Sequence, residues 1–207
     1  MNASEALQGL RALGTTVITT ADAAAALGLR PDAASQTLRR LAAAGLVSSL
    51  RKGLWAIDAV PDAPSLLEHV TAPHPAYVSL QSALYLRGMI DQVPAVLYAA
   101  SLGRTGQIET AVGAFSIHHL PPELFGGFDF DRATGAKLAT PEKALFDVSY
   151  LSGTRFRKFR ALPELELPRG FRRGRVDQWV RRIPSRRMRT LTTRRLAELI
   201  GAKKATE

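Results

Sequence analysis

The sequence predicts an α+β fold, and three observations lead to this prediction. Residues 1–57 show three short helical patterns followed by two strand patterns. Residues 77–153 mix helical patterns with apolar runs bounded by Gly and Pro, which indicate strands. Residues 154–207 combine many arginines with amphipathic helical spacing. We therefore expect a small N-terminal domain, then a mixed α/β domain with a basic helical C-terminal end.

The N-terminal helices are predicted from spacing and from residues that begin or end helices. The first is expected over Ser4–Leu13. The second has Thr20 as its expected cap and ends at Gly28, which tolerates the left-handed conformation of a helix terminus. Pro31 suits the first turn of a third helix, where its missing N–H has no partner to lose.

A hairpin is expected after the third helix. Its strands are Leu46–Leu50 and Leu54–Ile57, joined by a turn at Arg51–Gly53. The buried stripe of the third helix is expected to consist of Ala34, Leu38, Leu41, Gly45 and Leu46. Three helices and a hairpin in this order are typical of a winged helix-turn-helix, whose third helix enters the DNA major groove.

Six polar side chains are the candidate DNA contacts, because they lie off that stripe or at the hairpin turn. They are Ser35, Gln36, Arg39, Arg40, Arg51 and Lys52. Short polar groups and arginines can read base edges or bind phosphates, and phosphate contact requires less exact geometry. The alternative is that the three helices and the hairpin form only a packing module with solvated surface arginines.

The charge is concentrated at the C-terminal end. The chain has a net charge of +10, yet residues 154–207 carry 17 Lys and Arg against 5 Asp and Glu. Such an excess indicates a polyanionic partner or an acidic protein surface. The 22 arginines against 6 lysines can reflect codon bias, which does not explain the local excess of charge. The candidate nucleic-acid or partner contacts are Arg155, Arg157, Lys158, Arg172, Arg173, Arg181, Arg182, Arg186 and Arg187.

The same region carries two amphipathic helical patterns, separated at Pro184-Ser185. Trp179, Phe156 and Phe159 are interpreted as core residues rather than as platforms for base stacking, which would need exposed rings.

Residues 59–76 are predicted to be a proline-rich linker with a short apolar helix around Leu66, Leu67 and Val70. The predicted domains are therefore 1–58, a DNA-binding domain, and 77–207, with its basic helical part at 154–207. Within the second domain, Ser79 is the expected cap of a helix that ends at Gly88. The other expected elements are strands over Ala95–Ala100, Ile108–Leu120 and Gly135–Ala139, and a helix opened by Thr140-Pro141.

Several classes of function are disfavoured by what the sequence lacks. It has no cysteine, no apolar stretch long enough for a membrane span and no signal-peptide pattern at its start. We therefore expect a cytoplasmic protein without a membrane partner, a metal or another cofactor. A nuclease-type metal site could be imagined from the carboxylates of Asp129, Asp131, Glu142 and Asp147. However, Lys143 and Asp147 would simply pair across a helical turn, and Asp129 and Asp131 alternate as in a half-exposed strand.

Neither the adjacent histidines nor any known catalytic or phosphate-binding motif indicates a catalytic site. His118 and His119 are adjacent in a predicted strand, so their rings are expected on opposite faces. No Walker A motif, dinucleotide-binding glycine pattern or nucleophile elbow occurs. We expect no enzymatic activity.

Three segments resemble the AbiEi family. They are Tyr77–Ile90 (YVSLQSALYLRGMI), Gly113–Leu120 (GAFSIHHL) and Leu138–Asp147 (LATPEKALFD). The resemblance extends over nearly the whole chain, in the same order of parts. AbiEi proteins are antitoxins of bacterial type IV toxin–antitoxin systems.

The resemblance implies two activities. One is repression of the protein's own promoter, with the N-terminal domain bound to inverted repeats in double-stranded DNA through the six contacts named above. The other is antagonism of a nucleotidyltransferase-like toxin by the C-terminal domain, without a stable complex. Basic residues of that domain contribute to antitoxicity in the family. The alternatives are a stand-alone winged-helix regulator, whose second domain senses a ligand or dimerises, and a nucleic-acid enzyme.

Overall fold

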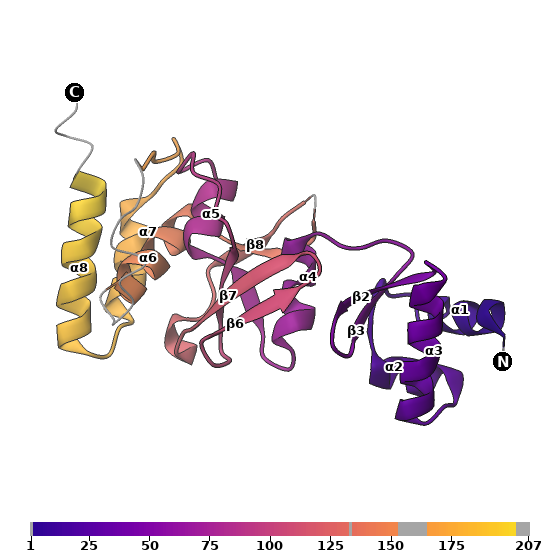
Figure 1. The fold of residues 1–207 in the computed structure, drawn as a ribbon. Helices are drawn as coiled ribbons and strands as arrows, with labels where there is room; N and C mark the ends of the chain where they lie inside the picture. Colours follow the sequence, from indigo (N-terminus) through magenta and orange to yellow (C-terminus); the bar gives the residue numbers. More distant parts are fainter. Residues whose placement is uncertain (1, 133, 153–164, 202–207) are drawn as a thin grey trace.

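The computed structural model describes residues 2–132, 134–152 and 165–201, and its fold is mixed α+β, as predicted (Figure 1). The molecule is elongated. A small group of helices and strands forms the N-terminal end, a larger sheet lies in the middle, and the C-terminal helices form the opposite end (Figure 1). In the described residues, no helix is long and apolar enough to cross a membrane.

The N-terminal unit contains three helices and a three-stranded antiparallel sheet. Its elements are α1 (Ala3–Arg11), β1 (Val17–Thr19), α2 (Thr20–Leu27), α3 (Pro31–Ala43), β2 (Val47–Arg51) and β3 (Leu54–Ile57). The strand order is β1-β3-β2, so the hairpin β2–β3 is joined by a third strand that the sequence did not predict.

Two details of the predicted N-terminal unit are corrected. Thr19, not Thr20, caps α2: the Thr19 hydroxyl accepts a hydrogen bond from the Asp22 amide at 3.1 Å, and the Asp22 carboxylate accepts one from the Thr19 amide at 2.8 Å. Gly45 and Leu46 do not belong to the buried stripe of α3, because both are exposed and both follow the end of the helix at Ala43. Ala34, Leu38 and Leu41 are buried as expected.

The central strand β3 of the small sheet is buried on both faces, and its two faces contact different parts of the chain. Trp55 and Ile57 of β3 pack with the helices α1–α3 in one apolar cluster. Leu54 and Ala56 face the other way and belong to a second, larger cluster that extends through the rest of the chain. The Ala111 amide also donates to the Leu50 carbonyl at 2.8 Å.

The larger sheet has six strands in the order β6-β7-β5-β4-β9-β8. They are β4 (Ala76–Val78), β5 (Leu97–Ser101), β6 (Gly106–Thr110), β7 (Gly113–His119), β8 (Phe128–Phe130) and β9 (Lys137–Ala139). The β5–β7 and β4–β9 pairs are parallel and the others antiparallel. The single strand predicted over Ile108–Leu120 is wrong: the run folds back as the β6–β7 hairpin, with Gly113 at φ +129° after its turn.

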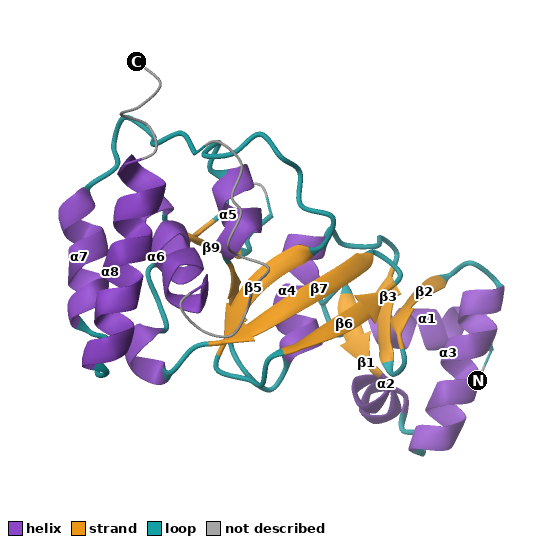
Figure 2. Ribbon diagram, turned by 60° about the vertical axis from the view of Figure 1, so that its left-hand side comes forward, coloured by secondary structure: helices purple, strands orange, loops and turns teal. Residues whose placement is uncertain are grey.

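Five helices pack on this sheet and at its far end (Figure 2). They are α4 (Ala63–Thr71), α5 (Leu80–Leu86), α6 (Pro141–Ser152), α7 (Arg173–Arg181) and α8 (Arg186–Gly201), and the short 3-10 turn η1 spans Pro122–Leu124. Within the segment predicted as a linker, α4 buries Leu66, Leu67 and Val70 in the larger core. Helix α6 is buried on nearly every side, packed against α5, α7 and α8. The predicted break at Pro184-Ser185 separates α7 from α8.

Candidate nucleic-acid interface

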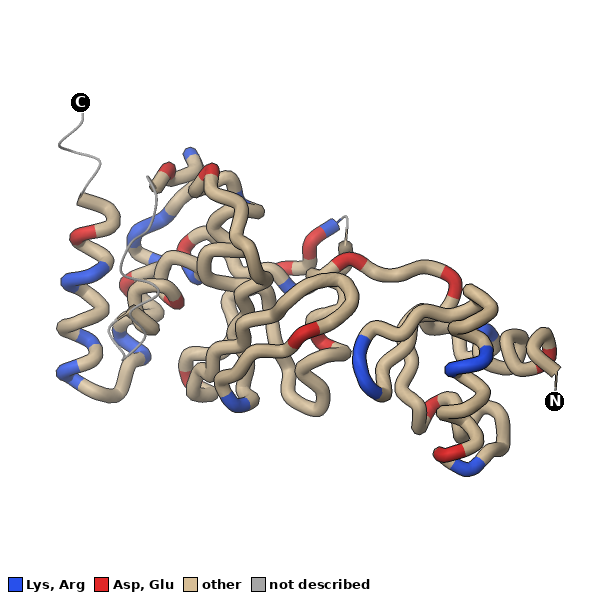
Figure 3. The backbone as a smooth tube through the Cα atoms, in the orientation of Figure 1, with Lys and Arg blue, Asp and Glu red and all other residues tan. Residues whose placement is uncertain are grey.

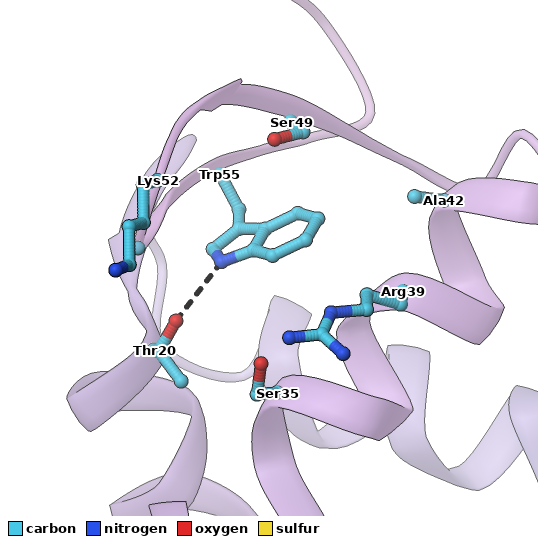
Figure 4. A pocket seen from close by; sticks show the side chains of 8 residues that line it. Thr20, Ser35, Arg39, Ala42, Ser49, Lys52 and Trp55 are labelled. Atoms are coloured by element: carbon cyan, nitrogen blue, oxygen red, sulfur yellow. Dashed lines mark hydrogen bonds between the residues drawn. The ribbon is translucent and has the colours of Figure 1, made fainter. Parts of the chain in front are cut away.

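A cleft of about 470 Å³ opens between α3 and the β2–β3 turn (Figure 4). Three of the six predicted DNA contacts line it: Ser35 and Arg39 from α3, and Lys52 from the turn. The other lining residues are Thr20, Ala42, Ser49, Gly53 and Trp55. Arg39 and Lys52 are both exposed, and no ion pair of either is found with another described residue.

The indole of Trp55 forms the floor of this cleft. Its ring lies between the hairpin and α3, with the Arg39 guanidinium extending toward it from the helix (Figure 4). The indole N–H donates to the Thr20 hydroxyl at 3.1 Å, which fixes the ring and gives Thr20 a role other than the predicted helix cap. Trp55 is 7% exposed, so most of the ring belongs to the unit's own core.

Three of the predicted contacts do not line the cleft. Gln36, Arg40 and Arg51 are exposed nearby, on α3 and at the end of β2. The Arg40 guanidinium donates to the Thr37 hydroxyl at 3.4 Å. Conversely, the sequence did not single out Ser49, Thr20 or Trp55 as site residues. Ser49 pairs with Trp55 across the hairpin, and this pairing brings both residues to the cleft. The register of the hairpin cannot be predicted from side-chain types.

The predicted basic contacts of the C-terminal end lie partly outside the described residues. This holds for Arg155, Arg157 and Lys158, and for Phe156 and Phe159. The remaining six, Arg172, Arg173, Arg181, Arg182, Arg186 and Arg187, are exposed at the start and end of α7 and the start of α8. Arg182 stacks on Trp179, with its guanidinium carbon 4.3 Å from the ring centroid. Trp179 is half-buried and packs on Phe146, as expected for a core residue.

A buried polar cluster joins residues 77–79 to helix α6. Lys143 and Asp147 of α6 form an ion pair, and both side chains are 0% exposed. The Asp147 carboxylate also accepts hydrogen bonds from the Ser79 hydroxyl at 2.7 Å and the Tyr77 hydroxyl at 3.0 Å. Ser79 is the N-cap residue of α5, as predicted, but its hydroxyl bonds to α6 and not to the backbone of α5.

Aromatic rings enclose the Lys143 ammonium. Its nitrogen lies 4.6 Å from the ring centroid of Trp179, 4.8 Å from that of Phe146 and 5.6 Å from that of Tyr77. Burial lowers the pKa of Lys143 and raises the pKa of Asp147, because desolvation penalises both charged forms. The pair is closed to solvent and is structural in this conformation.

The carboxylates considered for a metal site are dispersed. Asp129 pairs with Arg87, Asp131 accepts bonds from the amide and hydroxyl of Thr134 at 2.9 Å, and the Glu142 carboxylate accepts one from the Arg172 amide at 2.9 Å. Among the described residues, no group of His, Cys, Asp or Glu could hold a metal ion.

The adjacent histidines lie on opposite faces of β7, as predicted. His118 is buried, with its Nε2 atom 3.0 Å from the Ser116 hydroxyl, whereas His119 is exposed.

Comparison with known proteins adds no family assignment. No model of a known protein family matches this chain, and a search of curated proteins finds no match.

Proposed function

We propose that residues 1–58 form a winged helix-turn-helix and that the chain is a DNA-binding transcriptional regulator. The observation that carries the proposal is the cleft between α3 and the β2–β3 turn, which has on each wall a cation that forms no ion pair with another described residue. Gln36 and Arg40 are exposed on α3, and Arg51 is exposed at the end of β2, next in sequence to Lys52. A duplex that follows α3 would meet base-directed and phosphate-directed groups together.

We further propose that the protein is an AbiEi-like antitoxin that represses its own promoter. The support is the resemblance of its segments and the way two of them meet: Ser79 and Tyr77 from one bond to Asp147 from the other. The second domain would antagonise a nucleotidyltransferase-like toxin in the cytoplasm without a stable complex and without a catalytic step of its own. The basic surface of α7 and α8 is the candidate region for this activity.

A paired test separates the two activities. The first arm is growth rescue of cells that express a neighbouring, co-transcribed nucleotidyltransferase gene. The second is repression of a reporter placed behind the upstream DNA. The triple variant Arg39→Gln/Arg51→Gln/Lys52→Gln should lose repression and retain rescue. Full rescue by residues 1–60 alone would contradict the assignment of antitoxicity to the second domain.

The alternative is a stand-alone regulator whose second domain senses a ligand. An apolar cavity of about 260 Å³ supports it, with walls that include Tyr85, Leu86, Val93 and the β6–β7 turn residue Val112. That turn also contacts the hairpin β2–β3 through Ala111 and Leu50. This reading predicts repression in the absence of any toxin gene and a change in DNA affinity when a small apolar molecule binds.

A further inference from the structure

We propose that the cleft between α3 and the β2–β3 turn binds one sugar–phosphate unit, with Arg39 and Lys52 as the cations for its phosphate. The inference rests on the proposed function, in which duplex DNA supplies this unit. A free nucleotide carries the same chemistry, and the experiment below distinguishes the two sources.

The composition of the cleft matches this ligand class. Arg39 on one side and Lys52 on the other supply two positive charges that are not neutralised by a described carboxylate. The hydroxyl groups of Ser35 and Ser49 lie on the same walls and can donate to phosphate oxygens. Among the described residues that line the cleft, there is no Asp or Glu.

The floor of the cleft suits a sugar rather than a bare inorganic ion. Trp55 presents an indole between the two cationic walls, and Ala42 and Gly53 add further apolar surface (Figure 4). The volume of about 470 Å³ is much larger than a single phosphate needs and accommodates an attached sugar. The Thr20 hydroxyl already accepts from the Trp55 indole, so the ring has a fixed orientation before a ligand enters.

This assignment divides the predicted DNA contacts by role. Arg39 points into the cleft toward Trp55, so it would hold backbone and position the duplex (Figure 4). Gln36 and Arg40, which lie on α3 outside the cleft, are then the candidates for reading base edges. Loss of a phosphate contact weakens binding to all sequences alike and reduces its salt dependence.

The test measures affinity of the full-length protein for a labelled duplex of its upstream DNA and for an unrelated duplex, over a series of salt concentrations. Arg39→Gln and Lys52→Gln should each reduce the slope of log K against log salt by about 1 on both duplexes. Their preference for the upstream duplex should stay as in the wild type. Arg11→Gln is the matched control, because Arg11 is an exposed arginine of the same unit that pairs with Asp58 and does not line the cleft.

Tryptophan fluorescence identifies the source of the ligand. If the cleft takes DNA backbone, either duplex perturbs the emission of the wild type, Trp55→Phe loses that change, and ATP does not compete. If it takes free nucleotides, ATP perturbs Trp55 emission, and Arg39→Gln abolishes the effect.

The proposal is overturned if neither duplex nor ATP perturbs Trp55 and Arg39→Gln matches the Arg11→Gln control. It is also overturned if Arg39→Gln changes sequence preference instead of the salt slope. A wild type without a discrete upstream site would refute the proposed function. The cleft assignment would still stand in that case if Arg39→Gln lowers the affinity for unrelated duplex or ATP.

Discussion

The buried ion pair of Lys143 determines how substitutions in α6 affect stability. Its ammonium is fully buried, paired with Asp147 and surrounded by the rings of Tyr77, Phe146 and Trp179. A buried ion pair adds little net stability over an apolar pair of the same shape, because both charges lose their hydration. Removing one partner is costly, however, since the other charge is then left unpaired.

Lys143→Met should therefore lower the free energy of unfolding by about 3–5 kcal/mol, as expected for a buried carboxylate left without its cation. Urea denaturation followed by circular dichroism measures this loss. The double variant Lys143→Met/Asp147→Leu is the control and should recover much of the stability. A single variant as stable as the wild type would show that the pair is not buried in solution.

Tyr77 makes stability sensitive to alkaline pH. Burial, followed by the neighbouring Asp147 charge, raises its pKa well above the usual 10.0. The folded state therefore keeps the phenol protonated. The contribution of this phenol to the free energy of unfolding is fully present below pH 10 and is lost as the pH rises further. Above pH 10, each pH unit should favour the unfolded state by about 1.4 kcal/mol through this group. Unfolding at several pH values should give a shallower decline for Tyr77→Phe, and equal slopes would contradict the burial of this hydroxyl.

Among the secondary-structure elements, the helices were easier to predict from the sequence than the strands or the hydrogen-bond partners of polar side chains. The start of α3 at Pro31, the opening of α6 by Thr140 and the break at Pro184 follow from local chemistry that the sequence contains. The β6–β7 hairpin was missed because its turn residues, Ala111 and Val112, are apolar and are not residues typical of turns. β1 was missed because three residues carry no periodicity.

The candidate site was predictable in part for the same reason. Exposed positions of α3 follow from its helical period, so Arg39 and Ser35 could be found from the sequence. Trp55 and Ser49 could not, because their place in the cleft depends on hairpin register and on the packing of β3 against the helices. Likewise, Ser79 has the sequence context of a helix cap, and only the fold brings it to Asp147.

Gly127 controls how closely the C-terminal helices approach the sheet. A Cβ at this position would lie 2.6 Å from the Trp179 ring and 3.1 Å from the Lys143 side chain, at a backbone φ of +73°. Gly127→Ala should therefore strain the backbone, and overpacking should lower the free energy of unfolding by about a further 1–3 kcal/mol. Gly135→Ala is the matched control, because its φ is +68° and no atom of the described residues lies within 4 Å of the added Cβ. Equal losses of unfolding free energy in both variants would mean that the Trp179 contact is unimportant.

At the scale of the whole molecule, the two parts share a core although their charged surfaces are far apart. Lys and Arg gather around α3 and the β2–β3 turn near one end, and along α7 and α8 at the other (Figure 3). Between them, Val17, Leu50 and Leu54 of the N-terminal unit belong to the same apolar cluster as the six-stranded sheet. Because the two parts share this apolar cluster, a loss of stability in one part should also destabilise the other.

We expect the two parts to unfold together. Trp55 lies in the N-terminal unit and Trp179 on α7, so the variants Trp179→Phe and Trp55→Phe each leave one reporter. The two thermal transitions should coincide with the loss of far-ultraviolet dichroism of the same variant. Leu50 is 2% exposed and lies in the shared core. Leu50→Ala should therefore lower the free energy of unfolding by about 2–5 kcal/mol, whichever tryptophan reports the transition. An earlier, separate Trp55 transition would show that the units are independent.

A gel shift of the protein on its own upstream DNA tests whether it binds DNA in a sequence-specific manner. The assay uses excess unrelated duplex and two salt concentrations. We predict a discrete complex that survives the competitor and the higher salt, because base contacts add to phosphate contacts. A complex that disappears under both conditions would mean that the protein binds DNA only by nonspecific attraction between a basic protein and a polyanion.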